Sequence, residues 1–278
     1  VQEWSAPSSS VLWPLLLAPT ATAGVGHYVP LVLGLASSLL LIGLFVGRLR
    51  PLVENVPEGR QLVVTVVLGV GLVVATNLLG LTLVGMEHGL QTLAAVAVVV
   101  GLIRFLETDR LAPWFLLALV AGPWIRYENL ALTAPALVVL AWRRRWGWAL
   151  GAGGLCAAVL GGFSLFLYRL GLGWLPTSVL AKSATASRPG SLGTLAGNVM
   201  GNLQHSSGVV LAVILFGLLL ALLLRRGDAP ATDAGGGGHR PLLAFGAAAI
   251  ALHLLVGRCG WFGRYEVYVW AASLVLLL

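Results

Sequence analysis

The chain has 278 residues, of which 58% are hydrophobic and only 10% charged, and its mean hydropathy is +0.94. This composition lies outside the range of soluble globular domains and predicts an integral membrane protein. The net charge of +7 comes from arginines spread over many loops, so no basic face for nucleic acid is expected. Apolar runs recur along the whole length, which predicts a single all-α membrane domain over residues 1–278.

Nine apolar runs are candidate membrane spans, because a helix needs roughly 20 apolar residues to cross the hydrocarbon core. The fourth and fifth are short and are expected to be tilted or shielded by neighbouring helices. The chain opens without a methionine and stops inside the ninth run, so we expect a piece shortened at both ends. The nine runs are 28–47, 61–84, 89–106, 111–123, 129–142, 147–168, 208–224, 241–257 and 267 onward.

The arginines sort the loops between these runs into two groups. One group contains "GRLRPLVENVPEGR", "RFLETDR", "WRRRW" and "RRGDAPATDAGGGGHR", which together carry eleven arginines. The positive-inside rule places this group, with its flexible Gly-rich loop at 225–240, in the cytoplasm. The alternate loops carry five arginines and the only lysine, Lys182. We therefore predict a multi-pass plasma-membrane protein with these loops on the extracytoplasmic face.

Two segments are expected to lie along the outer membrane surface. Residues 1–26 hold a short apolar run with two prolines, which favours a re-entrant or interfacial helix. The long loop at 169–207 has apolar residues at helical spacing, separated by uncharged polar residues and glycines, which predicts an amphipathic helix. Those apolar residues are Leu192, Leu195, Ala196, Val199, Met200 and Leu203.

The string "GMEHGL" places Glu87 and His88 together in an outer loop. Ionisable groups at membrane depth are costly and often functional. A carboxylate beside an imidazole is a candidate for acid–base catalysis or for binding a divalent cation, with Glu87 as the metal ligand. The alternative is a helix cap, in which the glutamate charge meets the positive end of the next span.

The triplet Arg-Tyr-Glu occurs twice, in "WIRYENL" and in "WFGRYEVYVW". One interpretation is the wall of a polar cavity, in which arginine binds a phosphate through its planar fork. The other is an interfacial anchor, with the arginine extended toward water and the tyrosine at head-group level. Lys182 is a candidate phosphate ligand or a solvated loop residue. The candidate substrate-binding residues are Lys182, Arg126, Tyr127, Glu128, Arg264, Tyr265 and Glu266.

Other polar residues are assigned to packing. His253 and Asn77 lie inside predicted spans and are expected to be hydrogen-bonded packing residues. Cys156 lies inside an apolar run and Cys259 in a loop, so a disulfide between them is not expected.

Five strings in order along nearly all of the chain resemble the GT-C glycosyltransferases, and within them the bacterial group of arabinofuranosyltransferases and mannosyltransferase-like proteins. They are "VQEWSAPSSSVLWPLLLAP", "GMEHGLQTL", "RYENLAL", "GWLPTSVLAKS" and "GWFGRYEVYVW". The resemblance implies a helical fold with a catalytic cavity on the outer face, a polyprenyl-phosphate sugar donor and inversion at the anomeric carbon. It also implies a catalytic base upstream of Val1, a second acidic motif at Glu87, and donor-phosphate contacts from Lys182 and Arg264.

The expected function is therefore transfer of a sugar from a polyprenyl-phosphate donor to an extracytoplasmic glycan, lipid or protein of the cell envelope. The expected partners are that donor, that acceptor and membrane lipid, without nucleic acid, and a divalent cation is a candidate cofactor. One alternative is a transporter or lipid-carrier flippase, which should show discontinuous helices near the bilayer midplane. Another is a scaffold whose triplets only anchor spans.

Overall fold

The computed structural model describes residues 10–21, 24–182, 192–224, 239–260 and 264–278, without the side chains of residues 181–182. All regular structure in these ranges is helical, which confirms the all-α class. Among the described helices that are apolar but shorter than a full span are α6 (Pro113–Ile125), α7 (Leu130–Trp142) and α14 (Val267–Leu277). Six of the described helices are long and apolar enough to cross a membrane: α2 (Val29–Val53), α3 (Glu58–Ala75), α5 (His88–Thr108), α8 (Trp146–Arg169), α12 (Ser206–Leu224) and α13 (His239–Val256).

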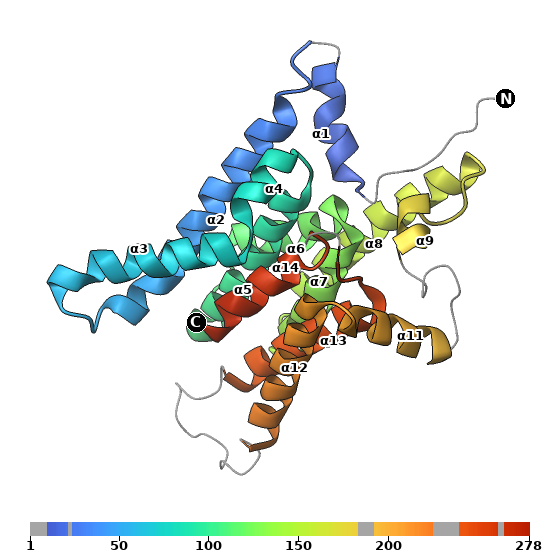
Figure 1. Ribbon diagram of the computed structural model, residues 1–278. Helices are drawn as coiled ribbons and strands as arrows, with labels where there is room; N and C mark the ends of the chain where they lie inside the picture. Colours follow the sequence, from blue (N-terminus) through green and yellow to red (C-terminus); the bar gives the residue numbers. More distant parts are fainter. Residues whose placement is uncertain (1–9, 22–23, 183–191, 225–238, 261–263) are drawn as a thin grey trace.

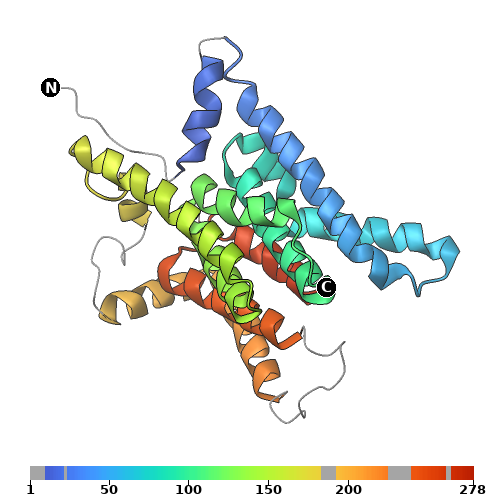
Figure 2. The same cartoon turned by 180° about the vertical axis from the view of Figure 1, so that it is seen from behind.

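Helix α5 is the centre of the bundle, packed against α2, α6 and α14. Most of its side chains are buried, and Gly101 lets the ring of Phe115 approach so closely that a Cβ would overlap it. In Figure 1, α5, α6, α7 and α14 lie in the middle, while α2 and α3 extend to one side. Figure 2 shows α8 crossing the opposite face. The short helices α6 and α7 are thus shielded by their neighbours, as expected for segments too short to span alone.

The apolar run at 61–84 is not one continuous helix, contrary to the prediction. Helix α3 ends at Ala75, and a separate short helix, α4 (Leu78–Val84), follows after a break. At the break, Asn77 adopts a left-handed backbone with a φ of 48°, which asparagine tolerates better than most residues. The indole of Trp270 donates a hydrogen bond to the carbonyl oxygen of Ala75 at 2.9 Å. The break is therefore supported by a contact from a helix almost 200 positions later, with |i−j| of 195.

The described loops meet at two ends of the bundle. Glu87 precedes α5 and Asp109 follows it, so these residues mark opposite ends. At one end, Arg145 pairs with Asp109 at 2.6 Å. At the other, Arg126 pairs with Glu87 at 3.0 Å, and we call this the Arg126 end. Which end faces the cytoplasm stays a prediction. Residues 1–9 and 225–238 of the predicted outer and cytoplasmic loops lie outside the described ranges.

The N-terminal apolar run forms helix α1 (Leu12–Ala21), too short to cross a membrane. Ser10 caps it by accepting a hydrogen bond from the Trp13 N–H at 2.8 Å. The N–H of Val11 donates to the carbonyl oxygen of Trp124 at 2.9 Å, which places the start of α1 against the last turn of α6, near the Arg126 end. An interfacial position in the membrane stays a prediction.

The amphipathic segment of the long loop forms helix α11 (Leu192–Leu203), as predicted. Its polar face does not turn to solvent. Asn198 and Asn202 donate to the carbonyl oxygen of Gly257 at 2.8 and 3.1 Å, and both also bond to carbonyls in the last turn of α13. These amides satisfy carbonyls that a helix end leaves without partners. The exposed side chains of α11 are apolar ones such as Met200.

Candidate functional site

A buried ion cluster centred on Arg126 is the main polar feature of the Arg126 end. The arginine is 1% exposed. Its Nη2 and Nε donate to the two carboxylate oxygens of Glu128 at 2.6 and 3.2 Å, and its Nη1 donates to Oε1 of Glu87 at 3.0 Å. The backbone of Arg126 is extended, with a φ of −155°, because the chain leaves α6 here before the 3₁₀ turn Tyr127–Asn129. Two carboxylates thus share one planar, multiply donating cation.

His88 and Tyr265 complete the cluster. The Nε2 of His88 lies 3.2 Å from Nη1 of Arg126, and since arginine has no acceptor, the imidazole nitrogen must accept. The guanidinium carbon lies 5.8 Å from the ring centroid of Tyr265, within range of a cation–π contact. Burial alone would lower the pKa of Arg126, but the neighbouring Glu128 and Glu87 outweigh this effect and raise it. Arg126 therefore stays charged at any physiological pH.

The second triplet is divided between two environments. Tyr265 faces the Arg126 cluster, whereas Glu266 belongs to a separate network. Its Oε1 accepts a hydrogen bond from Oγ of Ser207 at 2.6 Å, and its Oε2 accepts one from the N–H of Gly260 at 3.1 Å. Nη1 of Arg264 lies 3.5 Å from Sδ of Met86, in the same loop as Glu87. The triplets are thus in contact through one tyrosine and do not act as repeats of each other.

The structure brings together only some of the predicted site residues. Glu87, His88, Arg126, Glu128 and Tyr265 meet in one cluster, Arg264 reaches its edge, and Glu266 lies apart. Tyr127 lies beside the cluster in the 3₁₀ turn and lines the adjacent cavity. The side chain of Lys182 lies outside the described residues. Its helix, α9 (Thr177–Lys182), contributes Val179 to that cavity.

Glu87 occupies the N-cap position of α5 but makes no capping hydrogen bond there. Its carboxylate is directed to Arg126 instead, so a metal ion at Glu87 would compete with a fixed cation. Within the described ranges, no three His, Cys, Asp or Glu side chains are placed to hold a metal ion. A divalent cation at this position stays a prediction.

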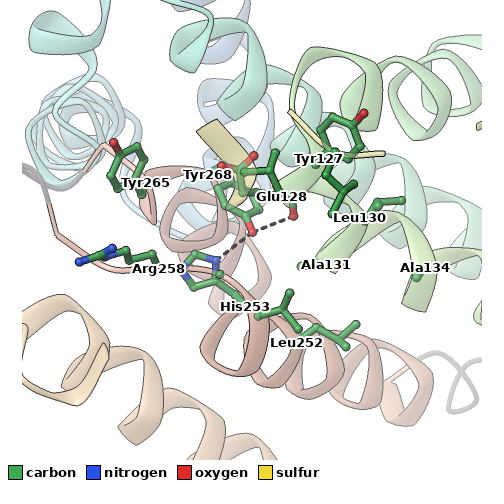
Figure 3. Close-up of a pocket in the computed structure, with 14 residues that line it drawn as sticks. Tyr127, Glu128, Leu130, Ala131, Ala134, Leu252, His253, Arg258, Tyr265 and Tyr268 are labelled. Carbon is green, nitrogen blue, oxygen red and sulfur yellow. Dashed lines mark hydrogen bonds between the residues drawn. The ribbon is translucent and has the colours of Figure 1, made fainter. Parts of the chain in front are cut away.

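A cavity of about 380 Å³ lies next to the ion cluster, and we call it the Glu128 cavity. Its lining has two parts, which Figure 3 shows on opposite sides of His253. Arg258 and Tyr265 lie on one side, and aliphatic residues of α7 and α13 on the other. The aliphatic wall consists of Leu130, Ala131, Ala134, Leu175, Val179, Leu252 and Val256. Such a lining suits a ligand with one polar end and one hydrocarbon end.

A chain of buried hydrogen bonds holds the turn that carries Glu128. The hydroxyl of Tyr268 donates to the backbone carbonyl of Glu128 at 2.8 Å, and Nδ1 of His253 lies 2.9 Å from the same hydroxyl. Because the tyrosine proton is used on the carbonyl, Nδ1 must donate and Nε2 must carry the lone pair. That Nε2 lies 3.8 Å from Sγ of Cys259. His253 is a hydrogen-bonded residue, as expected, but it also lines the cavity.

Sequence reasoning missed Tyr268 and Arg258. Tyr268 follows Tyr265 by three positions, a spacing that puts both on one face at the start of α14. This spacing is the sequence signal that could have identified Tyr268. Arg258 lies next to a loop with no recognisable pattern, so its charge was the only sequence feature that could indicate a site residue. Asn77, which was assigned to packing, stands instead at the helix break.

Cys259 is expected to be inert toward thiol reagents in the folded protein. It is buried, and burial together with the charge of Glu266 raises the pKa of its thiol to about 12. In a Cys156→Ala background at about pH 7.5, maleimide labelling should be at least about 100-fold slower than in detergent-denatured protein, because the thiolate is the nucleophile. Asn202 accepts a hydrogen bond from the Cys259 N–H at 2.8 Å, so Asn202→Ala should speed labelling. Equal rates in folded and denatured protein would contradict this environment.

Comparison with known proteins gives no match to a family model, to a curated protein or to a solved structure. The described residues form an all-helical bundle, and six of the described helices are apolar enough to cross a membrane. The candidate site is a buried ion cluster beside a cavity with a polar and an apolar wall. Function is therefore inferred from this geometry and from the resemblance in the sequence.

Proposed function

We propose that the protein is an inverting glycosyltransferase of the GT-C type, which transfers a sugar from a polyprenyl-phosphate donor to an acceptor outside the cytoplasm. The observation that carries the proposal is the two-part lining of the Glu128 cavity. A polyprenyl phosphate joins an anionic, hydroxylated head to a long hydrocarbon chain. Its head fits the side of Arg258 and Tyr265, and its chain fits the aliphatic wall.

In this proposal, Arg258 binds the donor phosphate. Arg126 is a poor candidate for that role, because its donors are already directed to two carboxylates. Arg258 is exposed and lines the cavity, so its fork is available to phosphate oxygens. Lys182 and Arg264 remain further candidates from the sequence resemblance. The Arg126 cluster then acts as a positioning element, which fixes the turn carrying Glu128.

The reaction would proceed by attack of an acceptor hydroxyl oxygen on the anomeric carbon. The bond from that carbon to the phosphate oxygen breaks as the new glycosidic bond forms, and the electron pair leaves with the phosphate. A base must take the acceptor proton, and the resemblance assigns this role to an acidic side chain of an external loop. Cations at the cavity would stabilise the charge that develops on the leaving phosphate.

The experiment is a transfer assay with full-length protein in proteoliposomes, given polyprenyl-phosphate pentose or hexose labelled in the sugar and a cell-envelope extract as acceptor. We expect label in the acceptor together with free polyprenyl phosphate. Arg258→Ala should lower turnover at least about tenfold, which corresponds to one charge-assisted contact. The control is Arg240→Ala, an exposed arginine near the start of α13, the helix that ends two residues before Arg258.

Transport is the second candidate function, and the break between α3 and α4 favours it, because discontinuous helices are typical of transporter sites. A transporter would move the labelled donor across the vesicle membrane and leave its sugar–phosphate bond intact. Movement of intact donor without release of polyprenyl phosphate would therefore overturn the transferase proposal.

A larger residue on the aliphatic wall should weaken binding of the donor's hydrocarbon chain. Ala134 lines the Glu128 cavity, whereas Val138, one turn further along α7, does not and is exposed. Ala134→Phe should raise the KM for a long polyprenyl donor by roughly tenfold or more, since about 0.8 kcal/mol is lost for each CH₂ left in water. The KM for a short-chain donor should change little. Val138→Phe is the matched control, and an equal effect of both variants would argue against this binding mode.

A further inference from the structure

We propose that a second cavity, on the other side of α14, binds a neutral polyhydroxylated ligand of the size of one sugar ring. This cavity has a volume of about 250 Å³, and we call it the Glu266 cavity. Its polar lining consists of Thr76, Asn77, Ser206, Ser207 and Glu266, and Trp270 forms an aromatic wall. In the proposed function, this sugar ring belongs to the acceptor. Only this assignment rests on the proposed function, and the binding itself does not.

The start of α14, together with the turn just before it, separates the two cavities. Tyr265 and Tyr268 line the Glu128 cavity, whereas Glu266 and Trp270 line the Glu266 cavity. With 3.6 residues per turn, positions 265 and 268 fall on one side of this turn and positions 266 and 270 on the other. A donor in one cavity and a second ligand in the other would thus be held by adjacent residues at the entry to one helix.

The break in the chain at Asn77 forms one wall of the Glu266 cavity. In a helix crossing a membrane, irregular backbone is tolerated where it is buried in protein or lines a cavity. Thr76 and Asn77, the two residues between α3 and α4, both line this one. The left-handed conformation of Asn77 costs energy for a residue with a side chain, and such local strain is commonly kept at ligand sites. The break therefore places the side-chain amide of Asn77 in the cavity wall, within a run that is otherwise apolar.

Glu266 decides the charge of the ligand. Its carboxylate is buried, and it makes no ion pair with any residue in the described ranges. Ser207 and Gly260 donate to it, and the N-terminal ends of α12 and α14 bring positive helix dipoles toward it. These groups balance the negative charge without a cation, and the carboxylate itself would repel an anion. The lone pairs that remain can accept hydrogen bonds from ligand hydroxyl groups.

The remaining lining complements such a ligand. Ser206 and Asn77 carry groups that both donate and accept hydrogen bonds. The indole of Trp270 is held by its hydrogen bond to the Ala75 carbonyl and gives a rigid apolar surface for the C–H face of a ring. The volume lies below the roughly 300–1,000 Å³ of pockets for drug-sized ligands, so one ring is the expected occupant.

The test is direct binding, measured by saturation-transfer NMR on the full chain in lipid nanodiscs. The probes are methyl pentofuranosides and methyl hexopyranosides at millimolar concentration, with empty nanodiscs as background. We expect saturation of ring protons by the wild type. Asn77→Gly and Glu266→Gln should bind about tenfold more weakly, as expected for one lost hydrogen bond to a charged or buried group. Asn77→Gly is well suited because glycine keeps the left-handed backbone and removes only the amide.

Arg240→Ala is the control, because Arg240 is exposed near the start of α13 and lines neither cavity, so glycoside binding should be unchanged. The sugar site would be overturned if the wild type did not bind the probes. It would also be overturned if Asn77→Gly and Glu266→Gln bound them as tightly as the wild type. Displacement of the probes by sodium or magnesium chloride but not by potassium chloride would also overturn it in favour of a cation site. Binding that depends on Asn77 and Glu266 without any sugar transfer would leave this site standing while the proposed function fails.

Discussion

Arg126→Met is expected to leave little folded protein. The substitution keeps an apolar stem of similar length but removes the cation shared by Glu87 and Glu128. Breaking one partner of a buried pair costs about 3–5 kcal/mol, because the other charge stays buried without compensation. We expect a large fall in monodisperse protein after size-exclusion chromatography and in its apparent melting temperature. Arg126→Lys should recover only part of the loss, since lysine cannot donate to both oxygens of one carboxylate in a planar fork.

A triple variant separates structure from function at the same cluster. Glu87→Gln, Arg126→Met and Glu128→Gln together remove all three charges and should restore most of the stability, because neutral groups can replace a buried ion network at little cost. If the cluster positions the site, sugar transfer should stay lost in this folded variant. Wild-type specific activity would support the scaffold alternative, in which the triplets only anchor helices. Arg126→Met with an unchanged melting temperature would show that the cluster is not a buried charge network.

Most helices could be predicted from the sequence because long apolar runs between arginine-rich loops leave few alternatives. The break at Asn77 could not. Asparagine and threonine are only slightly worse helix formers than valine, so two such residues in an apolar run do not by themselves end a helix. The break depends on Trp270, which reaches the Ala75 carbonyl from a helix distant in sequence.

The sequence predicted which loops lie at the same end of the bundle, but it did not predict which side chains contact one another. The order of the spans placed the loops of Glu87, Arg126 and Tyr265 at one end of the bundle, where the structure finds them in contact. No pattern in the sequence shows that Arg126 is paired with two carboxylates, because this depends on the distance between α5 and α6. The same holds for Glu266, whose serine and glycine donors lie in other segments. The phosphate-binding role predicted for Arg126 stays a prediction, and our proposed function gives this role to Arg258, which the spacing did not mark.

Tyr268→Phe is expected to lower stability by about 2–4 kcal/mol and also to slow sugar transfer. The hydroxyl accepts from His253 and donates to the Glu128 carbonyl, so its loss leaves one donor and one acceptor unsatisfied in a buried site. The turn carrying Glu128 then loses its link to α14. Turnover should fall more than the affinity for donor changes, because the aliphatic wall is untouched. Tyr28→Phe, at an exposed hydroxyl, should shift stability by less than about 0.5 kcal/mol.

A double-mutant cycle tests whether these groups act as one chain of hydrogen bonds. His253→Leu removes the donor to the hydroxyl, so adding Tyr268→Phe no longer leaves an unpaired imidazole N–H. The double variant should therefore cost about 1–2 kcal/mol less than the sum of the two single variants. Strict additivity would mean that His253 and Tyr268 stabilise the protein independently. In that case Tyr268 would hold the Glu128 carbonyl without help from His253.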